Sequence, residues 1–321
     1  MKFSLRLNND LPVAEYVRIA QAAERAGFDQ IWVSDDLFLR SAPVILSAVA
    51  VATSRIEIGT CIVNPYTLHP AEMAMMAATL DELSGGRFNL GLSSGAAEFL
   101  KWIDITPEKP LTAVTECVRA INALFNGEPV PGWETDAYLR FQPRRRVPIY
   151  IGAMSPNMLK AIGEIADGGL PLLFPPEHYE TVLPLIQAGA AKAGRDLSEI
   201  DVAACIWCCI GDDDGPLREK IAYYGHALSP LIWERLGLTR EDFSGIEQAV
   251  MTERDMEKAK RLVTPAMLRI GIVGSTADVI ARMEKLAALG VTHMSFGPPL
   301  GSDVLAAVEA LGRDVIPHFR R

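Results

Sequence analysis

The sequence predicts an α/β fold, a (β/α)8 barrel with a long helical insertion late in the chain. Short apolar segments alternate with helical segments along the 321 residues, which is typical of parallel sheets. Eight such units in a chain of this length favour a closed barrel over an open sheet. The turn after the first strand reads Asn8-Asn9-Asp10-Leu11 and lacks the glycines of a dinucleotide-binding fold, which also favours the barrel.

The first unit shows how each element is recognised. Phe3, Leu5 and Leu7 alternate with polar neighbours, so residues 3–7 form the first strand. Pro12 begins the first helix, where its missing N–H costs nothing, and Gly27 ends that helix. By the same signals the later strands are residues 28–33, 56–62, 87–92, 148–152, 168–174, 200–210 and 291–296. The later helices are residues 42–52, 71–83, 111–125, 157–166, 178–193, 276–289 and 303–316.

Two segments interrupt this alternation. Residues 127–147 are rich in Pro, Gly and Arg and are predicted to be a loop or insertion. Residues 211–266 contain helical pieces without a strand, and residues 267–273 are predicted to be extended or irregular. We interpret residues 1–321 as one barrel domain with an insertion at 211–266 that lies near the barrel mouth as a lid or wall. Its candidates for a substrate pocket, or equally for its own small core, are Tyr223, Tyr224, His226, Trp233 and Met251.

Composition excludes several classes of protein. With 31 Lys+Arg against 40 Asp+Glu, the formal charge is −9, and the only compact basic run is 144–146, so a nucleic-acid partner is not expected. No apolar stretch is as long as the roughly 18–20 residues of a membrane span, and no secretory leader is recognisable, so no membrane partner is expected. The five cysteines, an odd number, favour a reducing, cytoplasmic location.

The carboxyl ends of the strands are where a barrel carries its chemistry. Arg6 lies at the carboxyl end of the first strand, and Asp35 and Asp36 follow the second. Adjacent strand residues point to opposite faces, so the two aspartates are not expected to share a metal ion. His69 precedes Pro70 and is either a base or a helix cap.

Small residues follow the fourth and fifth strands, at 93–97 and 152–155. Their backbone N–H groups are suited to hold a phosphate of a cofactor, although a plain tight turn is the more common explanation of such a segment. The cysteines at 205, 208 and 209 have no second Cys/His pair at metal-binding spacing, so we interpret them as structural and predict no metal. No G-x-S-x-G sequence supports a Ser-His-Asp site.

Four segments identify a resemblance that spans almost the whole chain. They are Asn-Pro-Tyr-Thr-Leu-His-Pro at 64–70, Thr-Leu-Asp-Glu-Leu-Ser-Gly-Gly-Arg at 79–87, Gly-Ala-Met-Ser-Pro at 152–156 and Gly-Glu-Ile-Ala-Asp-Gly at 163–168. In these segments the chain resembles the luciferase-like superfamily of flavin and deazaflavin enzymes. Within it, the chain is most similar to the coenzyme F420-dependent methylenetetrahydromethanopterin reductases.

The resemblance implies a barrel that binds a deazaflavin at the carboxyl ends of its strands. It also implies a non-prolyl cis peptide bond, by position Cys61–Ile62, against one face of the deazaflavin ring. The cofactor-binding residues that it implies are Asp35, Cys61, Ile62, Asn64, Gly95, Ala96, Ala97, Gly152, Ala153 and Met154. A homodimer or higher homo-oligomer is the assembly that the resemblance implies.

Departures from the family pattern concern proton transfer. Arg6 occupies the place of a first-strand glutamate, which is the proton donor of those reductases, and Asp35-Asp36 replaces an Asp-His pair. Gly95 is followed by Ala96 where relatives often have an acid. We therefore expect a reaction other than pterin reduction.

The sequence accordingly predicts a coenzyme F420-dependent oxidoreductase that transfers a hydride between the deazaflavin and an unidentified small organic substrate. Its candidate catalytic residues are Arg6, Asp36, His69 and Glu98. Arg6 either binds an anionic substrate group or forms a salt bridge with Asp35 or Asp36. Two alternatives stay open, an FMN-dependent luciferase-like monooxygenase and a flavin-binding relative without catalytic activity.

Overall fold

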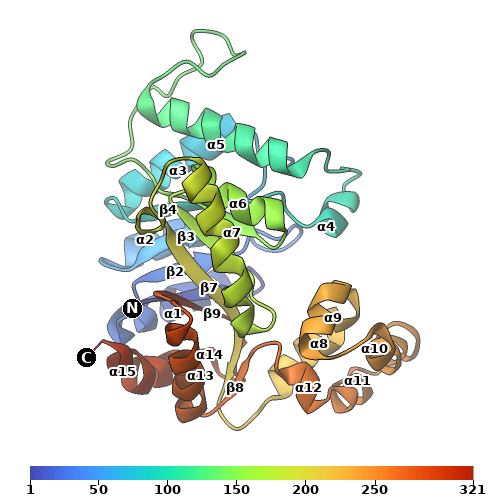
Figure 1. Ribbon diagram of the computed structural model, residues 1–321. Helices are drawn as coiled ribbons and strands as arrows, with labels where there is room; N and C mark the ends of the chain where they lie inside the picture. The colour runs from blue at the N-terminus through green and yellow to red at the C-terminus, as the bar shows by residue number, and fades with distance from the viewer. Residues whose placement is uncertain (321) are drawn as a thin grey trace.

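The computed structural model describes residues 1–320 and contains a closed parallel β-barrel surrounded by helices (Figure 1). Its eight barrel strands are β1 (Lys2–Leu7), β2 (Gln30–Val33), β3 (Glu57–Thr60), β4 (Phe88–Leu92), β5 (Ile149–Ala153), β6 (Gly168–Pro171), β7 (Asp201–Ile210) and β9 (His293–Leu300). Neighbouring strands pair in parallel, and the pairs β6–β7, β7–β9 and β9–β1 close the ring. The predicted (β/α)8 barrel is therefore confirmed.

One further strand lies outside the predicted set. β8 (Ile272–Gly274) pairs with the last three residues of β7, beyond the part of β7 that pairs with β6. Residues 267–273 are predicted only to be extended or irregular, because a segment of three residues is too short to be recognised as a strand. β7 is long enough, at ten residues, to pair with β6, β9 and β8 along different parts of its length.

Helices cover the outside of the barrel (Figure 1). They are α1 (Val13–Ala26), α2 (Ala42–Ala52), α3 (Pro70–Ser84), α5 (Pro110–Asn126), α6 (Pro156–Ile165), α7 (Tyr179–Lys192), α13 (Thr276–Ala288) and α14 (Val304–Ala310). Gly27 ends α1 in the left-handed conformation, as its sequence position predicts. Short segments complete the surface: α4 (Ala97–Lys101), α15 (Ile316–Phe319), the 3-10 turns η1 (Pro176–His178) and η2 (Leu197–Glu199), and the π-helical η5 (Leu311–Val315).

Several of the predicted boundaries were wrong. The strand predicted at 168–174 ends at Pro171, and the strand predicted at 291–296 spans His293–Leu300. The strand predicted at 56–62 ends at Thr60, because the chain turns at the cis peptide bond between Cys61 and Ile62. The helix predicted at 303–316 is divided into α14, η5 and α15, since its hydrogen-bond pattern loosens to a π-helix after Ala310. Helix α4 was not predicted because five residues carry too little periodicity to be recognised.

The predicted insertion is helical and lies to one side of the barrel (Figure 1). It consists of α8 (Gly215–Tyr224), η3 (Gly225–Ala227), α9 (Pro230–Leu236), α10 (Arg240–Glu247), η4 (Gln248–Glu253), α11 (Met256–Leu262) and α12 (Pro265–Leu268). Its apolar residues form a second core, which includes Leu217, Ile221, Phe243 and Ile246. Trp207 of β7 belongs to this second core, so the insertion is anchored on the barrel itself.

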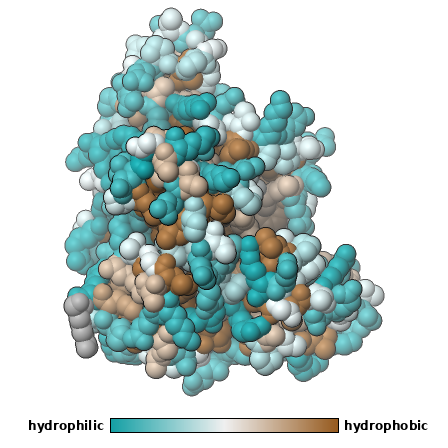
Figure 2. Space-filling view, in the orientation of Figure 1, coloured by the Kyte–Doolittle hydropathy of each residue, from teal (hydrophilic) through white to brown (hydrophobic). Residues whose placement is uncertain are grey.

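On the face of the molecule shown in Figure 2, hydrophobic residues are scattered among hydrophilic ones. None of the helices that the structure describes is both long enough and apolar enough to cross a membrane. Residues 127–147 contain no helix or strand, as predicted.

Candidate functional site

A cavity of about 500 Å³ lies at the carboxyl ends of the strands, and we call it the rim cavity. The loops after β1, β2, β3, β4 and β5 contribute to its wall. Nine of the ten predicted cofactor-binding residues line it, namely Asp35, Cys61, Ile62, Asn64, Gly95, Ala96, Gly152, Ala153 and Met154. The structure thus brings together residues that are more than 110 positions apart in the sequence.

The wall of the rim cavity contains the cis peptide bond predicted between Cys61 and Ile62. Gly152, at the end of β5, faces this bond, and a Cβ atom there would lie 3.1 Å from Cγ2 of Ile62. Ser93 Oγ donates a hydrogen bond of 2.7 Å to the Gly152 carbonyl and ties the loop after β4 to β5. The absence of a side chain at Gly152 therefore allows the loops after three strands to meet closely around the cavity.

Asn64 and Gly95 form the adjoining wall. Asn64 Oδ1 accepts hydrogen bonds of 3.1 Å from the N–H groups of Tyr66 and Thr67, which holds the turn after the cis bond. Gly95 has a φ of +72°, and a Cβ atom there would lie 3.2 Å from the Asn64 side chain. Within residues 1–320 the N–H groups of residues 94–96 donate no hydrogen bond, so they are free to face an anion.

The two adjacent aspartates of the rim cavity have different roles. Asp35 Oδ1 accepts a hydrogen bond of 2.9 Å from the Ala42 N–H and so caps the start of α2. Burial raises the pKa of Asp35 above its usual value, against the effect of that hydrogen bond. Burial also raises the pKa of Asp36, with Asp35 and Asp10 adding to the rise and Lys220 and Arg6 opposing it. Asp36 thus belongs to a group of charges at the barrel mouth.

Arg6 points into the mouth from β1 and is only 8% exposed. Its Nη2 donates one long hydrogen bond of 3.5 Å to the Ile206 carbonyl, and its buried Nε has no partner. In the part of the chain that the structure describes, Arg6 forms no ion pair with Asp35 or Asp36. Of the two roles weighed for Arg6, the salt bridge is the one that is not formed.

Three predicted site residues lie outside the lining of the rim cavity. His69 Nδ1 accepts a hydrogen bond of 3.2 Å from the Ala71 N–H, so this side chain caps α3. Its ring stacks on Trp133 with 5.0 Å between centroids. Glu98 and Ala97 are exposed at the start of α4. The structure therefore leaves Arg6 and Asp36 as the two predicted catalytic candidates within the cavity.

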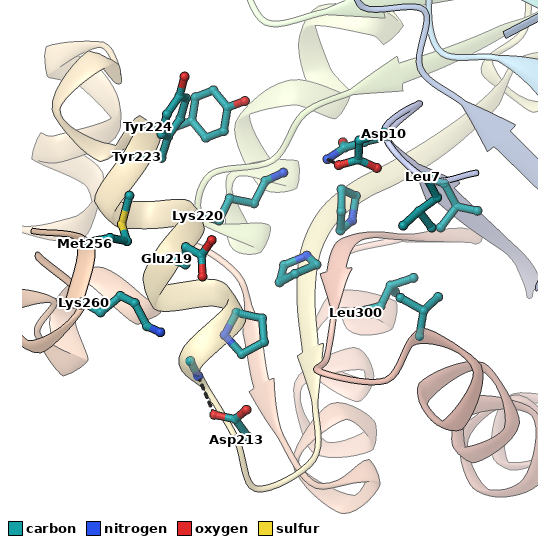
Figure 3. Close-up of a pocket in the computed structure, with 17 residues that line it drawn as sticks. Leu7, Asp10, Asp213, Glu219, Lys220, Tyr223, Tyr224, Met256, Lys260 and Leu300 are labelled. Atoms are coloured by element: carbon teal, nitrogen blue, oxygen red, sulfur yellow. Dashed lines mark hydrogen bonds between the residues drawn. The ribbon is translucent and has the colours of Figure 1, made fainter. Parts of the chain in front are cut away.

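A second cavity of about 630 Å³ lies between the barrel and the insertion, and we call it the insertion cavity (Figure 3). It shares Asn8 and Tyr224 with the rim cavity, so the two adjoin. Tyr223 and Tyr224 line it, as the substrate-pocket interpretation of the insertion expected. Trp233 packs in the insertion core instead, where its Nε1 donates to the Gly225 carbonyl. Met251 is 60% exposed, and neither it nor His226 lines the cavity.

Lys220 is the functional candidate that the sequence did not indicate. It lines the insertion cavity from α8, and burial together with the charge of Arg6 lowers its pKa to about 8. No sequence pattern marks it, because a lysine on an amphipathic helix ordinarily lies on the solvated face. Only the packing of α8 against the barrel mouth turns this side chain toward Arg6 and Asp36.

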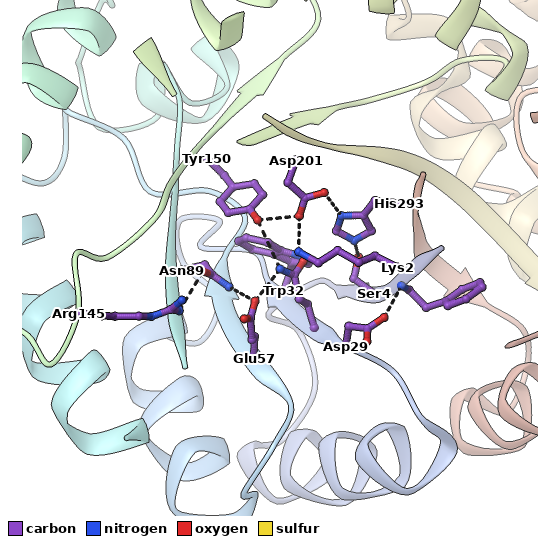
Figure 4. Close-up of polar contacts among 12 residues, drawn as sticks. Lys2, Ser4, Asp29, Trp32, Glu57, Asn89, Arg145, Tyr150, Asp201 and His293 are labelled. Atoms are coloured by element: carbon purple, nitrogen blue, oxygen red, sulfur yellow. Dashed lines mark hydrogen bonds and ion pairs between the residues drawn. The ribbon is translucent and has the colours of Figure 1, made fainter. Parts of the chain in front are cut away.

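The opposite end of the barrel carries a different polar cluster (Figure 4). His293 Nδ1 donates to Asp201 Oδ1 at 2.9 Å, and its Nε2 lies 2.9 Å from Ser4 Oγ. This arrangement has the hydrogen-bond order of a Ser-His-Asp triad. Ser4 and His293 are fully buried, however, and no substrate reaches them, so the cluster is structural.

The remaining His, Cys, Asp and Glu side chains form neither a metal site nor a reactive thiol within residues 1–320. Within residues 1–320 no group of three or more His, Cys, Asp or Glu side chains is placed to hold a metal ion. The five cysteines are free thiols, and those at 205, 208 and 209 are buried. Burial raises the pKa of the Cys61 thiol to about 12, so this residue of the rim cavity stays protonated.

Comparison with known proteins places this geometry in a family. The model of the luciferase-like monooxygenase family matches residues 2–293. The chain belongs to this family. Among its relatives, a 5,10-methylenetetrahydromethanopterin reductase of Archaeoglobus fulgidus is 31% identical, with both chains covered completely. An F420-dependent glucose-6-phosphate dehydrogenase of Beutenbergia cavernae is 30% identical over 93% of this chain and 91% of the relative.

A solved structure supports this membership of the luciferase-like family. The coenzyme F420-dependent tetrahydromethanopterin reductase of Methanopyrus kandleri superposes with a TM-score of 0.92 at 32% identity. The superposition covers 99% of each chain, so the insertion is shared as well as the barrel. The chain is accordingly an oxidoreductase of the luciferase-like family.

Proposed function

We propose that the chain is a coenzyme F420-dependent oxidoreductase that transfers a hydride between the deazaflavin and a small organic substrate. The observation that carries the proposal is the rim cavity, where the cis bond at Cys61–Ile62 faces Gly152. Gly152 has no side chain that would keep a planar ring away from this bond, and Asn64 and Gly95 close the adjoining wall. The reductase of Methanopyrus kandleri, which has the same architecture, is named for this coenzyme.

The residues of the rim cavity fit the parts of such a coenzyme. Cys61, Ile62 and Gly152 would lie against the ring, and Ala153 and Met154 along its polar edge. The free N–H groups of residues 94–96 would receive the phosphate of its side chain. When bound, the deazaflavin supplies hydride chemistry without oxygen chemistry, because its ring lacks the nitrogen that dioxygen activation requires.

The substrate of this reaction would bind in the insertion cavity. This cavity adjoins the rim cavity at Asn8 and Tyr224, so a substrate there would contact the exposed face of the ring. The resemblance implies that Arg6 occupies the place of a glutamate proton donor of the reductases, and its guanidinium stays charged at neutral pH. We therefore propose a reaction other than pterin reduction, with Arg6 orienting or polarising the substrate.

Cofactor binding and turnover test the proposal. The purified protein is titrated with coenzyme F420 and with FMN by fluorescence and calorimetry, and turnover is followed with each reduced cofactor with and without air. The substrate panel holds methylenetetrahydromethanopterin, glucose 6-phosphate, and simple secondary alcohols and ketones. We expect F420 to bind at micromolar concentration or below and to exchange hydride independently of oxygen.

The alternatives give different results in the same experiment. Oxygen-dependent turnover with reduced FMN would instead identify a monooxygenase. Binding of either cofactor without turnover of any compound would identify a binding protein without catalytic activity.

We also propose that the chain associates with a second copy of itself. Helix α2 is apolar on nearly all sides, yet Val44 is 61% exposed and Val51 is 71% exposed. Met75 and Leu83 of the neighbouring α3 are exposed as well. Sedimentation analysis is expected to give a dimer or larger oligomer that Val51→Asp dissociates, whereas a monomeric wild-type protein would contradict the proposal.

A further inference from the structure

Lys220 occupies a position from which it can reach a substrate. Helix α8 carries it on the side that faces the barrel, and its side chain extends into the insertion cavity toward Asp10 (Figure 3). The cavity adjoins the rim cavity at Asn8 and Tyr224. A small molecule between the two would therefore contact both the Lys220 ammonium and whatever occupies the rim cavity.

The surroundings of Lys220 leave its ammonium without a fixed partner. Its Nζ lies 5.0 Å from the ring centroid of Trp207 and 5.6 Å from that of Tyr224. Across residues 1–320 it forms no hydrogen bond or ion pair. The charged groups that face it are Arg6 from β1, Asp10 from the loop after β1, and Asp36 from the loop after β2.

A second lysine of the insertion cavity, unlike Lys220, has a fixed partner. Lys260 of α11 lines the insertion cavity but donates a hydrogen bond of 2.9 Å to Glu257. That hydrogen bond raises the pKa of Lys260, whereas burial and the nearby Arg6 lower the pKa of Lys220 to about 8. Lys220 can thus give up a proton near neutral pH, and Lys260 serves as a matched control.

Other groups in the cavity are less suited to exchange a proton. Arg6 does not deprotonate at ordinary pH. Burial raises the pKa of Tyr224, so its phenol is a weaker acid than the Lys220 ammonium. Asp36 lines the rim cavity and is one of the charged groups that face Lys220. Its negative charge favours the protonated form of Lys220 before the reaction.

We propose that Lys220 is the catalytic residue that exchanges the proton accompanying hydride transfer, and that the substrate carries a C=O or C=N bond in its oxidised form. In the direction of reduction, the carbon of that bond receives the hydride and its π electron pair moves to the oxygen or nitrogen. The Lys220 ammonium gives its proton to that pair and becomes a neutral amine, which solvent reprotonates. The substrate is reduced by two electrons and the deazaflavin is oxidised by two. This inference rests on the proposed function above.

The first test measures the acidity of Lys220 without any substrate. The protein is labelled with trace acetic anhydride between pH 6 and 11, and mass spectrometry follows acetylation of Lys220 and Lys260 in the same sample. We expect Lys220 to react with a midpoint near pH 8 and Lys260 at its ordinary pH or above. Equal midpoints near pH 10 would overturn the inference whatever the turnover.

The second test separates proton exchange from positive charge. Lys220→Arg keeps the charge and Lys220→Met removes it, and both are compared with Lys260→Met, using the panel compound that the wild type turns over fastest. We expect both Lys220 variants to bind coenzyme F420 within twofold of the wild type, but to lose about a hundredfold in kcat. The decline in wild-type rate above pH 8 should also disappear in both variants. Lys260→Met should keep the decline in rate above pH 8 whatever its effect on the absolute rate, because Lys220 is still present in that variant.

The outcomes distinguish the inference from the proposed function. A Lys220→Arg variant with the wild-type rate would show that charge alone is required and would overturn the inference while leaving the function intact. Failure of the wild type to bind F420, or to turn over any panel compound, would overturn the proposed function and the inference with it. A defect of Lys220→Met in folding is detected by circular dichroism, and the comparison then rests on Lys220→Arg.

Discussion

The two ends of the barrel carry polar clusters of opposite character. At the amino end, Asp201 accepts hydrogen bonds from His293, Lys2 and Tyr150, at 2.9, 2.7 and 2.8 Å (Figure 4). At the carboxyl end, the cations Arg6 and Lys220 lie close to one another. Within residues 1–320 neither of them forms an ion pair with a carboxylate. Both clusters are largely buried, so burial alone does not separate a structural cluster from a functional one.

The difference lies in whether the buried groups are satisfied. Hydrogen bonds and charges fixed within the protein lower the pKa of Asp201 far below its usual value, against the effect of burial. At the mouth, burial prevails and moves the pKa values of Asp36 and Lys220 toward their uncharged forms. A satisfied cluster stabilises the fold, whereas an unsatisfied one retains free energy that a ligand can release.

The largest expected effect is a loss of stability when the polar cluster at the amino end of the barrel loses Asp201. Asp201→Ala leaves His293, Lys2 and Tyr150 without their common acceptor, so we expect a loss of about 3 kcal/mol in the free energy of unfolding. Urea denaturation followed by circular dichroism measures it. Asp36→Asn at the mouth is the control and should change stability by less than about 1 kcal/mol. Equal losses in the two variants would remove the distinction between the ends.

The amino-end cluster should also control how the stability of the protein depends on pH in acid. Because the pKa of Asp201 is lowered in the folded state, its contribution to stability is complete above its unfolded value of 3.8 and is lost as the pH falls below that value. Asp201→Asn should therefore show a flatter decline in stability than the wild type between pH 4 and 2. Parallel curves for both proteins would mean that this carboxylate does not control acid unfolding.

A smaller effect is expected at the wall of the rim cavity. In Gly152→Ala the new methyl group would lie 3.1 Å from Cγ2 of Ile62, so the loops must separate slightly and coenzyme affinity should fall about tenfold. Gly127→Ala, at a positive φ of +70° with open space around it, is the control. It should cost about 1 kcal/mol of stability and leave coenzyme affinity unchanged. Fluorescence titration with coenzyme F420 measures both variants.

The smallest expected effect is a gain, rather than a loss, in the free energy of unfolding. Since folding lowers the pKa of Lys220 to about 8, its burial opposes folding while it is charged, and this cost disappears as the pH rises from 8 toward 10.5. At pH 7, Lys220→Met should therefore raise the free energy of unfolding by about 1 kcal/mol. Thermal unfolding at pH 7 and pH 10 checks both statements. A destabilised variant at pH 7 would show that Lys220 serves the fold.

The sequence by itself determined the barrel and most of its elements. The alternation of Phe3, Leu5 and Leu7 and the glycine at 27 are local signals that neighbouring residues encode, although the closed barrel buries the polar residues of β1 between them as well. The place of the cis bond followed from resemblance to a family, as did ten predicted cofactor-binding residues, of which nine line the rim cavity. His69 shows the limit of this approach, because capping of α3 uses the ring nitrogen that a catalytic base would need.

Tertiary structure alone decided which charged groups meet. Arg6 and Lys220 are separated by more than 200 residues, and their approach depends on how α8 packs against the barrel mouth. Likewise, Ser4, Asp201 and His293 meet only because the register of β1, β7 and β9 brings them to one level of the closed sheet. Local patterns determine which face of an element is buried. Which polar groups become partners depends on strand register and helix packing, which no short stretch of sequence contains.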